Sequence, residues 1–328
     1  MPLTQIPSLA QIQQPVADHL EPVVAELRRI VFHDFPAIGE VNDHLLWARG
    51  KLFRPTLVLL ANQTGDRPYE HVVTLAAVVE LVHLATLVHD DAVDHSVLRR
   101  GMPTVNGLWN HQTAVIMGDY LYSRSISTLA DLGVIDFLQV LSRAANEMSV
   151  GELRQLYSFD ALQFSERDYD RLIASKTASL MSAACELGAA AGAPAHRRVL
   201  ARYGHALGMA FQIADDLLDY TGTADEVGKP TGLDLREHKV TLPLIAALPR
   251  MTGTERAEVE AFFADPVPSD EGIDRVMELV LDHGGLEYAR SRAEEFGETA
   301  AEALHSLPDS ESARALHEAV GYVIGRRR

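Results

Sequence analysis

The 328-residue sequence is poor in several residue types, and each scarcity limits what the protein can be. Its single cysteine, Cys185, cannot form an intrachain disulfide or a zinc cluster, so we expect a reducing, cytoplasmic location. Within an alanine-rich helical stretch, Cys185 is interpreted as a small core residue and not as a nucleophile. The N-terminal segment carries acids and scattered prolines instead of the basic and then apolar pattern of a signal peptide.

Long apolar runs are also missing. No stretch of about 18 or more uninterrupted apolar residues occurs, so the sequence predicts no membrane-spanning segment. Hydrophobic residues nevertheless make up 47% of the chain, which is enough to form a core and excludes disorder as the main state.

Positive charge is scarce, because 29 basic residues face 46 acidic ones and leave a net charge of −17. This balance predicts no nucleic-acid partner. An acidic protein can still bind a polyanion through a local basic cluster or through metal ions. Lysine is scarcer still, since only four of the 29 basic residues are lysines: Lys51, Lys176, Lys229 and Lys239.

Alternating β-type patterns are absent, and helical periodicity is present almost everywhere, which predicts an all-α fold. We expect a single domain over residues 1–328, a large helical bundle, with residues 1–15 as a loosely ordered N-terminal arm. Expected helices cover 17–33, 51–64, 71–94, 111–131, 136–159, 166–191 and 196–220, with peripheral helices over 233–328. Residues 71–94 are apolar on nearly all sides, as in a buried helix. Gly204 and Gly208 lie four apart and permit close helix packing.

Two helices end in the same pattern of aspartates, D-D-x-x-D. The first cluster is Asp90, Asp91 and Asp94, and the second is Asp215, Asp216 and Asp219. In each, the first and last aspartates share a helical face. Carboxylates at a helix C-terminus are unfavourable unless cations join them, and hard divalent ions prefer oxygen ligands. One such cluster could be a solvated acidic helix end, but two followed by glycine-bearing, basic loops favour a metal site.

Cations follow both clusters and point to an anion. Arg99 and Arg100 come after the first cluster, and Lys229 and Lys239 come after the second. Arginine binds phosphate in a bidentate manner, and lysine supplies a point charge. Acids and bases that meet around Mg²⁺ are typical of a diphosphate site. A further pair, Lys51 and Arg54, opens the helix expected at 51–64 and could hold a second anion.

These residues resemble the motifs of the trans-isoprenyl (polyprenyl) diphosphate synthase family. The matching segments, in order, are GKLFRP at 50–55, HDDAVDHSVLRRGMPTVN at 89–106, GDYLYSR at 118–124, GELRQL at 151–156, KTASLMSAACELGA at 176–189 and FQIADDLLDYTGTADEVGKPTGLDLREHKVTLPLI at 211–245. The resemblance implies helices around a central cavity, usually in a homodimer. It also implies condensation of isopentenyl diphosphate with an allylic diphosphate and about three Mg²⁺ ions bound to oxygen ligands.

The resemblance also implies a role for each matching residue. Asp90, Asp94 and Asp215 would bind the Mg²⁺ ions, supported by Asp91, Asp216 and Asp219. The allylic diphosphate would be held by Arg99, Lys176, Lys229 and Lys239. The diphosphate of isopentenyl diphosphate would be held by Lys51, Arg54, Arg100 and His83. Thr177 and Gln212 would lie beside the developing allylic cation, and the released diphosphate would take up the proton.

Three positions depart from the family pattern. Arg49 stands where a glycine is usual before Gly50, and His238 stands where a glycine is usual before Lys239. His95 replaces a common acid. None is a proposed direct ligand, so these departures concern loop geometry. Arg326, Arg327 and Arg328 could form a solvated tail or a flap near the diphosphates.

Product length should depend on the residues before the first cluster. Ala85 and Thr86, five and four residues before Asp90, are small, and Val82 and Leu81 below them offer no aromatic plug. From Ala85 down to Leu75 the helix runs about 15 Å. We therefore expect an all-trans product of about C30 to C50, as a quinone side chain needs; a farnesyl or geranylgeranyl diphosphate synthase is the alternative.

Other classes fit less well. A di-iron carboxylate bundle needs two Glu-x-x-His pairs, and the sequence offers Glu80 with His83 and Glu302 with His305, the second pair on a polar, peripheral helix. A non-catalytic partner subunit typically lacks the aspartates. A terpene cyclase shares the first motif, but its second motif mixes Asn, Ser or Thr with Glu.

Overall fold

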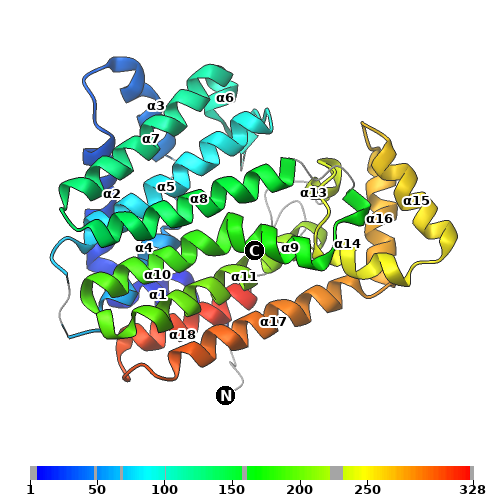
Figure 1. The fold of residues 1–328 in the computed structure, drawn as a ribbon. Helices are drawn as coiled ribbons and strands as arrows, with labels where there is room; N and C mark the ends of the chain where they lie inside the picture. Colours follow the sequence, from blue (N-terminus) through cyan, green and yellow to red (C-terminus); the bar gives the residue numbers. More distant parts are fainter. Residues whose placement is uncertain are drawn as a thin grey trace.

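The computed structural model describes residues 6–47, 50–66, 69–99, 101–156, 161–221 and 232–325. Regular structure within these residues is almost entirely helical, which confirms the predicted all-α fold (Figure 1). The α-helices are α1 (Leu9–Gln13), α2 (Ala17–Val31), α3 (Pro36–Trp47), α4 (Phe53–Asn62), α5 (Val72–Val93), α6 (Val105–Leu108), α7 (His111–Asp131), α8 (Ile135–Leu156), α9 (Glu166–Ile173), α10 (Ser179–Gly192), α11 (Arg197–Thr221), α13 (Leu233–Arg236), α14 (Leu242–Ala247), α15 (Gly253–Ala264), α16 (Asp270–Asp282), α17 (Gly285–Leu304) and α18 (Glu311–Ile324).

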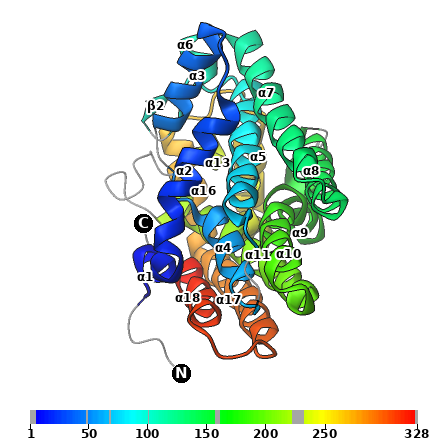
Figure 2. The same cartoon turned by 90° about the vertical axis from the view of Figure 1, so that its left-hand side faces the viewer.

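Helix α5 lies in the main core and ends in the first aspartate cluster. It contacts α7, α4, α2 and α10, and Figure 2 shows it between α2 and α7. By length and composition it could cross a membrane, but 61% of its most apolar window is buried inside the fold, as in the core helix of a soluble protein. Its apolar sides are therefore explained by packing against neighbouring helices.

Residues 8–15 differ from the loosely ordered arm that was expected over residues 1–15; residues 1–5 lie outside the described part of the chain. Ser8 caps α1 with a reciprocal capping box, and Ile12 is fully buried. The side-chain amide of Gln13 donates hydrogen bonds to the Lys51 carbonyl at 3.0 Å and to Thr56 Oγ1 at 3.1 Å. Residues 8–16 therefore pack onto the bundle, because the Ile12 side chain is buried there and the Gln13 amide forms hydrogen bonds with the start of α4.

The two glycines of α11 allow the close packing that their spacing predicts. A Cβ on Gly204 would lie 2.6 Å from the Met181 carbonyl oxygen, and one on Gly208 would lie 2.5 Å from Ala178 Cα. Helix α11 thus runs directly against α10 and the segment before it. That segment, Ala174–Ala178, is a π-helix where the sequence predicted one continuous helix over 166–191. Such bulges are frequent at functional sites.

The first irregular segment, 95–110, contains a short antiparallel pair of strands, β1 (Leu98–Arg99) and β2 (Met102–Pro103). Gly101 has a φ of +76°, a left-handed conformation that glycine adopts without strain. The sequence also predicts an irregular segment at 221–235, after the second aspartate cluster, and its residues 222–231 lie outside the described residues.

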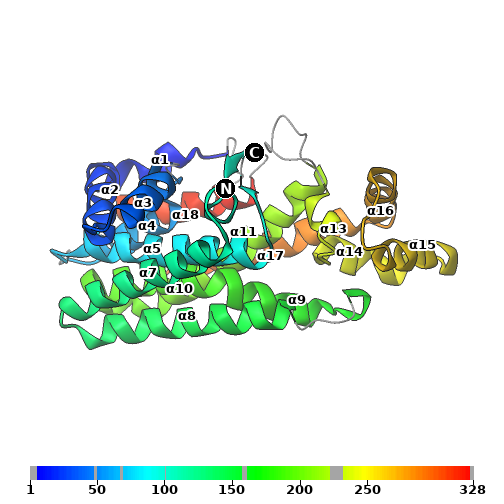
Figure 3. The same ribbon diagram turned by 90° about the horizontal axis from the view of Figure 1, so that it is seen from above.

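The far end of the molecule is formed by α15 and α16, which lie at the opposite end from α2 and α3 (Figure 1). Figure 3 shows α8 and α9 along one face and α1, α2 and α3 along the other. A second hydrophobic cluster, which includes Leu235, Leu244, Phe262 and Val276, joins α13 and α14 to α15 and α16. A third, with Tyr169, Ile213 and Ala289, joins α9, α11 and α17. These clusters fix the position of the chain around the end of α11.

Candidate active site

The C-terminal ends of α5 and α11 meet at one cavity of about 590 Å³, a usual size for a ligand pocket. Its lining residues are Asp91, Asp94, Ser96, Leu98, Arg99, Gln155, Leu156, Phe164, Tyr169, Leu172, Ile173, Lys176, Thr177, Gln212, Asp215, Asp216, Leu233, Asp234, Glu237, His238, Lys239, Val240 and Thr241. Side chains from both aspartate clusters and from the cations after them therefore face one space, as their sequence pattern predicted.

In the first cluster, Asp90 and Asp94 each face a lysine. Lys176 Nζ lies 3.8 Å from Asp90 Oδ2, and Lys239 Nζ lies 3.6 Å from Asp94 Oδ2. Burial raises the pKa of Asp90 to about 6; the charge of Lys176 opposes this rise, and that of Glu152 adds to it. The two aspartates on one helical face are thus matched by two lysines from elements far away in sequence.

Each of these lysines also has a glutamate partner outside the aspartate motifs. Lys176 Nζ lies 2.7 Å from Glu152 Oε2, and it donates a 3.1 Å hydrogen bond to Gln155 Oε1. Lys239 Nζ lies 2.6 Å from Glu237 Oε2. Sequence reasoning assigned no role to these glutamates. The only signal was that Glu152 lies in the GELRQL segment and Glu237 lies two residues before Lys239.

Asp91 and Arg99 form a second kind of pair at the cavity wall. Arg99 Nε donates a 2.8 Å hydrogen bond to Asp91 Oδ1, and the Asp91 side chain is largely buried. Because Arg99 lies in β1, the short hairpin delivers its guanidinium to the end of α5. Arg100, its predicted companion, lies outside the described residues.

A chain of hydrogen bonds runs from the π-helix to the second cluster. Thr177 Oγ1 donates to Gln212 Oε1 at 2.7 Å, and Gln212 Nε2 donates to Asp216 Oδ1 at 2.8 Å. Tyr169 Oη donates to the other oxygen, Asp216 Oδ2, at 2.6 Å. Burial raises the pKa of Asp216 well above its usual range, and Asp234 adds to the effect, while the Tyr169 and Gln212 bonds favour the carboxylate. Tyr169 was missed in the sequence, where nothing marks it.

Asp219, the last residue of the second motif, does not line the cavity. Its two carboxylate oxygens accept hydrogen bonds from the backbone N–H groups of Leu233 and Asp234, at 3.1 and 3.0 Å. It therefore anchors the start of α13. Asp215 does line the cavity. Asp234, missed in the sequence, lines it too, and burial with the charge of Asp219 raises the pKa of Asp234 to about 7.

The carboxylates fit metal ions that arrive with a phosphate ligand. Among the described residues, no three His, Cys, Asp or Glu side chains form a ready-made metal site. Asp91, Asp94, Asp215 and Asp216 instead offer hard oxygen atoms to one cavity from two helix ends. Mg²⁺ typically takes one or two carboxylates and completes its shell with phosphate oxygens and water. This donor set therefore suits a metal–diphosphate complex.

The second predicted anion site lies apart from this cavity. Lys51 is exposed just before α4, Arg54 lies in the first turn of α4, and His83 lies on α5; none of them lines the 590 Å³ cavity. A Cβ on Gly50 would lie 3.3 Å from Glu80 Oε1, so the start of α4 runs against the middle of α5. Lys229, predicted for the first diphosphate, lies outside the described residues, as do Arg49 and the Arg326–Arg328 tail.

The residues predicted to govern product length lie on α5, in or at the edge of the protein core. Leu81, Val82 and Ala85 are buried and Thr86 is half-buried, and none lines the cavity. The di-iron alternative fails on placement, because Glu80 is buried in the core while Glu302 and His305 are exposed at the end of α17.

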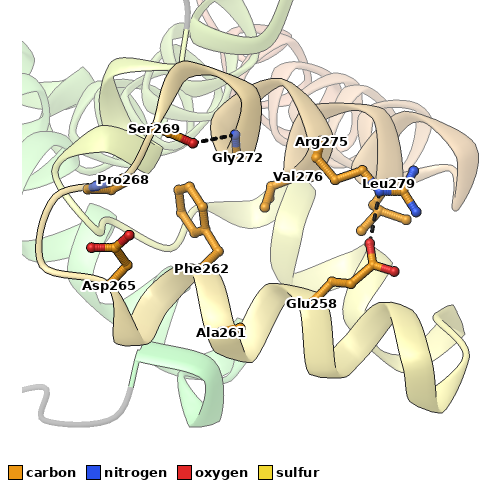
Figure 4. Close-up of a pocket in the computed structure, with 10 residues that line it drawn as sticks. All are labelled: Glu258, Ala261, Phe262, Asp265, Pro268, Ser269, Gly272, Arg275, Val276 and Leu279. Carbon is orange, nitrogen blue, oxygen red and sulfur yellow. Dashed lines mark hydrogen bonds and ion pairs between the residues drawn. The ribbon is translucent and has the colours of Figure 1, made fainter.

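A smaller cavity of about 200 Å³ lies between α15 and α16 (Figure 4). The Phe262 ring points into it, and Arg275 Nε pairs with Glu258 Oε2 at 2.9 Å on its rim. No residue of the aspartate motifs lines it. His238 lines the main cavity, and its Nε2 lies 2.8 Å from the carbonyl oxygen of Asp265, which lines the smaller one.

Comparison with known proteins gives consistent matches over most of the chain. The family model described as Polyprenyl synthetase matches residues 35–280. An all-trans-nonaprenyl-diphosphate synthase (geranyl-diphosphate specific) of Rhodobacter capsulatus is 42% identical over 282 residues, which is 85% of this chain and 86% of that protein.

Two solved structures have the same fold. A polyprenyl synthase from Caulobacter crescentus, complexed with calcium and isoprenyl diphosphate, matches with a TM-score of 0.93 at 32% identity, covering 99% of both chains. A decaprenyl diphosphate synthase from Rhodobacter capsulatus matches with a TM-score of 0.92 at 39% identity, covering 98% of this chain and all of the other.

Proposed function

Because the chain belongs to the polyprenyl synthetase family, we propose that it is a Mg²⁺-dependent prenyltransferase that condenses isopentenyl diphosphate with an allylic diphosphate to make a long all-trans polyprenyl diphosphate. The family membership confirms the resemblance that the sequence motifs indicated. The observation that carries the proposal is that two aspartates of each cluster meet at one cavity with three cations: Asp91, Asp94, Asp215 and Asp216 with Arg99, Lys176 and Lys239. Asp90 is not among the lining residues, but its carboxylate lies 3.8 Å from Lys176 Nζ.

The allylic diphosphate occupies the 590 Å³ cavity between the two helix ends. Asp90, Asp94 and Asp215 would hold the Mg²⁺ ions, with Asp91, Asp216 and Asp219 supporting them. When bound, these ions neutralise the charge that builds up on the diphosphate oxygens as the allylic bond breaks. Arg99, Lys176, Lys239 and Lys229 grip the same oxygens, and the lysines can turn from their present carboxylate partners to do so.

The carbocation forms beside Thr177 and Gln212. The Thr177 hydroxyl donates its proton to Gln212 Oε1, so its oxygen can stabilise positive charge nearby through its lone pairs. The apolar walls, which include Leu172, Ile173 and Phe164, exclude water that would quench the cation. The released diphosphate takes up the proton after addition.

Isopentenyl diphosphate binds at the start of α4. Lys51, Arg54 and His83, with Arg100, hold its diphosphate and orient its double bond toward the cavity. The capped N-terminal helix supports this loop, because Gln13 holds the Lys51 carbonyl and the Thr56 hydroxyl. Two separate cation groups then serve two diphosphates.

A long product, of about C30 to C50, fits the small side chains of Ala85 and Thr86 above the apolar stretch of α5. A farnesyl or geranylgeranyl diphosphate synthase would need a bulky barrier on this face, and Val82 and Leu81 do not supply an aromatic one. A quinone side chain is the use that such a product fits.

We place the enzyme in the cytoplasm as a homodimer. Apolar side chains remain exposed around α6 and α7, with Ile116 at 65% and Leu108 at 49% exposure. A dimer contact over these helices would cover them. The proposal includes no nucleic-acid partner and no membrane-spanning segment.

One experiment tests the central claim. Purified protein is incubated with Mg²⁺, isopentenyl diphosphate and allylic primers of increasing length, and the products are sized. We expect long polyprenyl diphosphates from the wild type and none from Asp90→Ala. The matched control is Asp131→Ala, which removes an exposed aspartate at the C-terminal end of α7. Full activity in a folded Asp90→Ala protein would contradict the proposal.

A further inference from the structure

Two lysines at the cavity have the same unusual pair of neighbours. Lys176 lies 2.7 Å from Glu152 and 3.8 Å from Asp90. Lys239 lies 2.6 Å from Glu237 and 3.6 Å from Asp94. In both cases the shorter contact is to a glutamate outside the D-D-x-x-D motifs, and the longer one is to a motif aspartate.

The arrangement repeats with parts from different places. Glu152 comes from α8 and Lys176 from the π-helix, whereas Glu237 and Lys239 lie two residues apart in one loop after α13. Gln155 Oε1 and Asp234 are the other groups near these ammonium ions. Both ammonium groups therefore already have anionic partners when a diphosphate enters the cavity.

The glutamate of each lysine–glutamate pair can be replaced by another anion. The Lys176 and Glu152 side chains are 29% and 23% exposed, and those of Lys239 and Glu237 are 32% and 35% exposed. Ion pairs that water reaches are weak, because solvent screens them and ordering two long side chains costs entropy. A diphosphate with bound metal can therefore replace each glutamate, and each glutamate can return when the diphosphate leaves.

We propose that Glu152 and Glu237 are exchangeable counter-ions that hold Lys176 and Lys239 at the cavity between reactions and compete with inorganic diphosphate for them. This inference rests on the proposed function and concerns the release of its second product. Each condensation leaves one diphosphate in the cavity, and a long chain needs several condensations. Competing glutamates shorten the time for which that diphosphate blocks the site, so they act on its release and not on the bond-forming step.

The test is the affinity for inorganic diphosphate in the presence of Mg²⁺, measured by calorimetry and as product inhibition. Glu152→Gln and Glu237→Gln keep the shape of each side chain and remove its charge. We expect each variant to bind inorganic diphosphate about two- to fivefold more tightly than the wild type. The control Glu298→Gln removes an exposed charge from α17, away from the cavity, and should leave the affinity unchanged.

A double-mutant cycle shows whether each glutamate acts through its lysine. In a Lys176→Ala background, Glu152→Gln should no longer tighten diphosphate binding, and Lys239→Ala should cancel the effect of Glu237→Gln in the same way. Unchanged or weaker diphosphate binding in both single glutamate variants would overturn the inference, because weaker binding would mean that the glutamates only position the lysines. Wild-type protein that makes no polyprenyl diphosphate would instead refute the proposed function.

Discussion

The hydroxyl of Tyr169 donates a 2.6 Å hydrogen bond to Asp216 in the buried wall of the cavity. Tyr169 and Asp216 are 2% and 5% exposed, and they come from α9 and α11. Asp216 is thus held by Tyr169 on one oxygen and by Gln212 on the other. Because burial raises the pKa of Asp216, these two donors are what favours its charged form in the absence of metal.

Removing this hydroxyl should therefore affect metal binding as well as stability. In Tyr169→Phe we expect a loss of about 1–3 kcal/mol of unfolding free energy, because a buried carboxylate loses a donor. We also expect a higher Mg²⁺ concentration at half-maximal activity, because the carboxylate is less often ionised. Urea unfolding and a Mg²⁺ titration of activity measure the two effects.

The matched control is Tyr203→Phe. Tyr203 is fully buried on α11, and its hydroxyl donates a 2.7 Å hydrogen bond to the Leu316 carbonyl on α18, outside the cavity lining. This variant should lose stability without changing the Mg²⁺ dependence. An identical Mg²⁺ dependence in Tyr169→Phe and the wild type would contradict the assigned role.

His238 links the loop that carries Lys239 to α15. It has a left-handed backbone with φ of +55°, its Nε2 lies 2.8 Å from the Asp265 carbonyl oxygen, and its ring contacts Phe262 and Phe263. In His238→Gly the backbone conformation is retained at no steric cost, but the anchor is lost. We expect near-normal thermal stability and a several-fold higher KM for the allylic diphosphate.

His238→Asn separates the anchor from the backbone conformation. Asparagine tolerates the left-handed region and keeps a polar side chain, so its KM should lie between those of the wild type and His238→Gly. Equal KM values in all three proteins would show that the imidazole does not position Lys239.

Asp234 should make the metal-free protein less stable at alkaline pH. Its pKa is raised from its ordinary value to about 7 by burial and by the charge of Asp219. A raised folded-state pKa gives stability that is present at acidic pH and lost as the pH rises through the folded value. With a chelator present, Asp234→Asn should therefore raise the unfolding free energy at pH 8 by about 1–2 kcal/mol, and by less at pH 5, where the folded-state carboxyl is still largely protonated.

Thermal melts at both pH values, with EDTA, measure this difference. The variant should also lose activity with Mg²⁺, since Asp234 lines the cavity. A variant that is less stable than the wild type at pH 8 would contradict the electrostatic explanation.

The sequence pointed to the aspartates and lysines of the candidate site better than to the polar residues that contact them. The aspartates could be found because the same three-carboxylate pattern ends two apolar helices, which a solvated helix end explains poorly when it occurs twice. The lysines could be found because lysine is so rare in this sequence. Tyr169 and Glu152 could not be found, since single polar residues on amphipathic helices resemble ordinary surface residues until the fold brings them to the cavity. The π-helix and α3 (Pro36–Trp47) were missed for a related reason, because helix type and the packing of short helices depend on tertiary contacts.

Product length provides the last test, at the buried face of α5. Ala85, Val82 and Leu81 share this face at helical spacing and are buried. A phenylalanine at Ala85 would place a ring in the path of a growing chain that passes below the first aspartate cluster. We expect Ala85→Phe to make shorter polyprenyl diphosphates, with kcat for the first condensation little changed.

Overpacking a buried helix costs about 1–3 kcal/mol, so Thr86→Phe, at a half-buried position, provides a second variant with the same expected direction. Ala76→Phe is the matched control, because Ala76 is equally buried on α5 but nine residues away, on the opposite side of the helix. It should cost stability without shortening the product. If all three variants make products of wild-type length, the growing polyprenyl chain does not pass along this face of α5, because a phenylalanine ring placed there would otherwise block it.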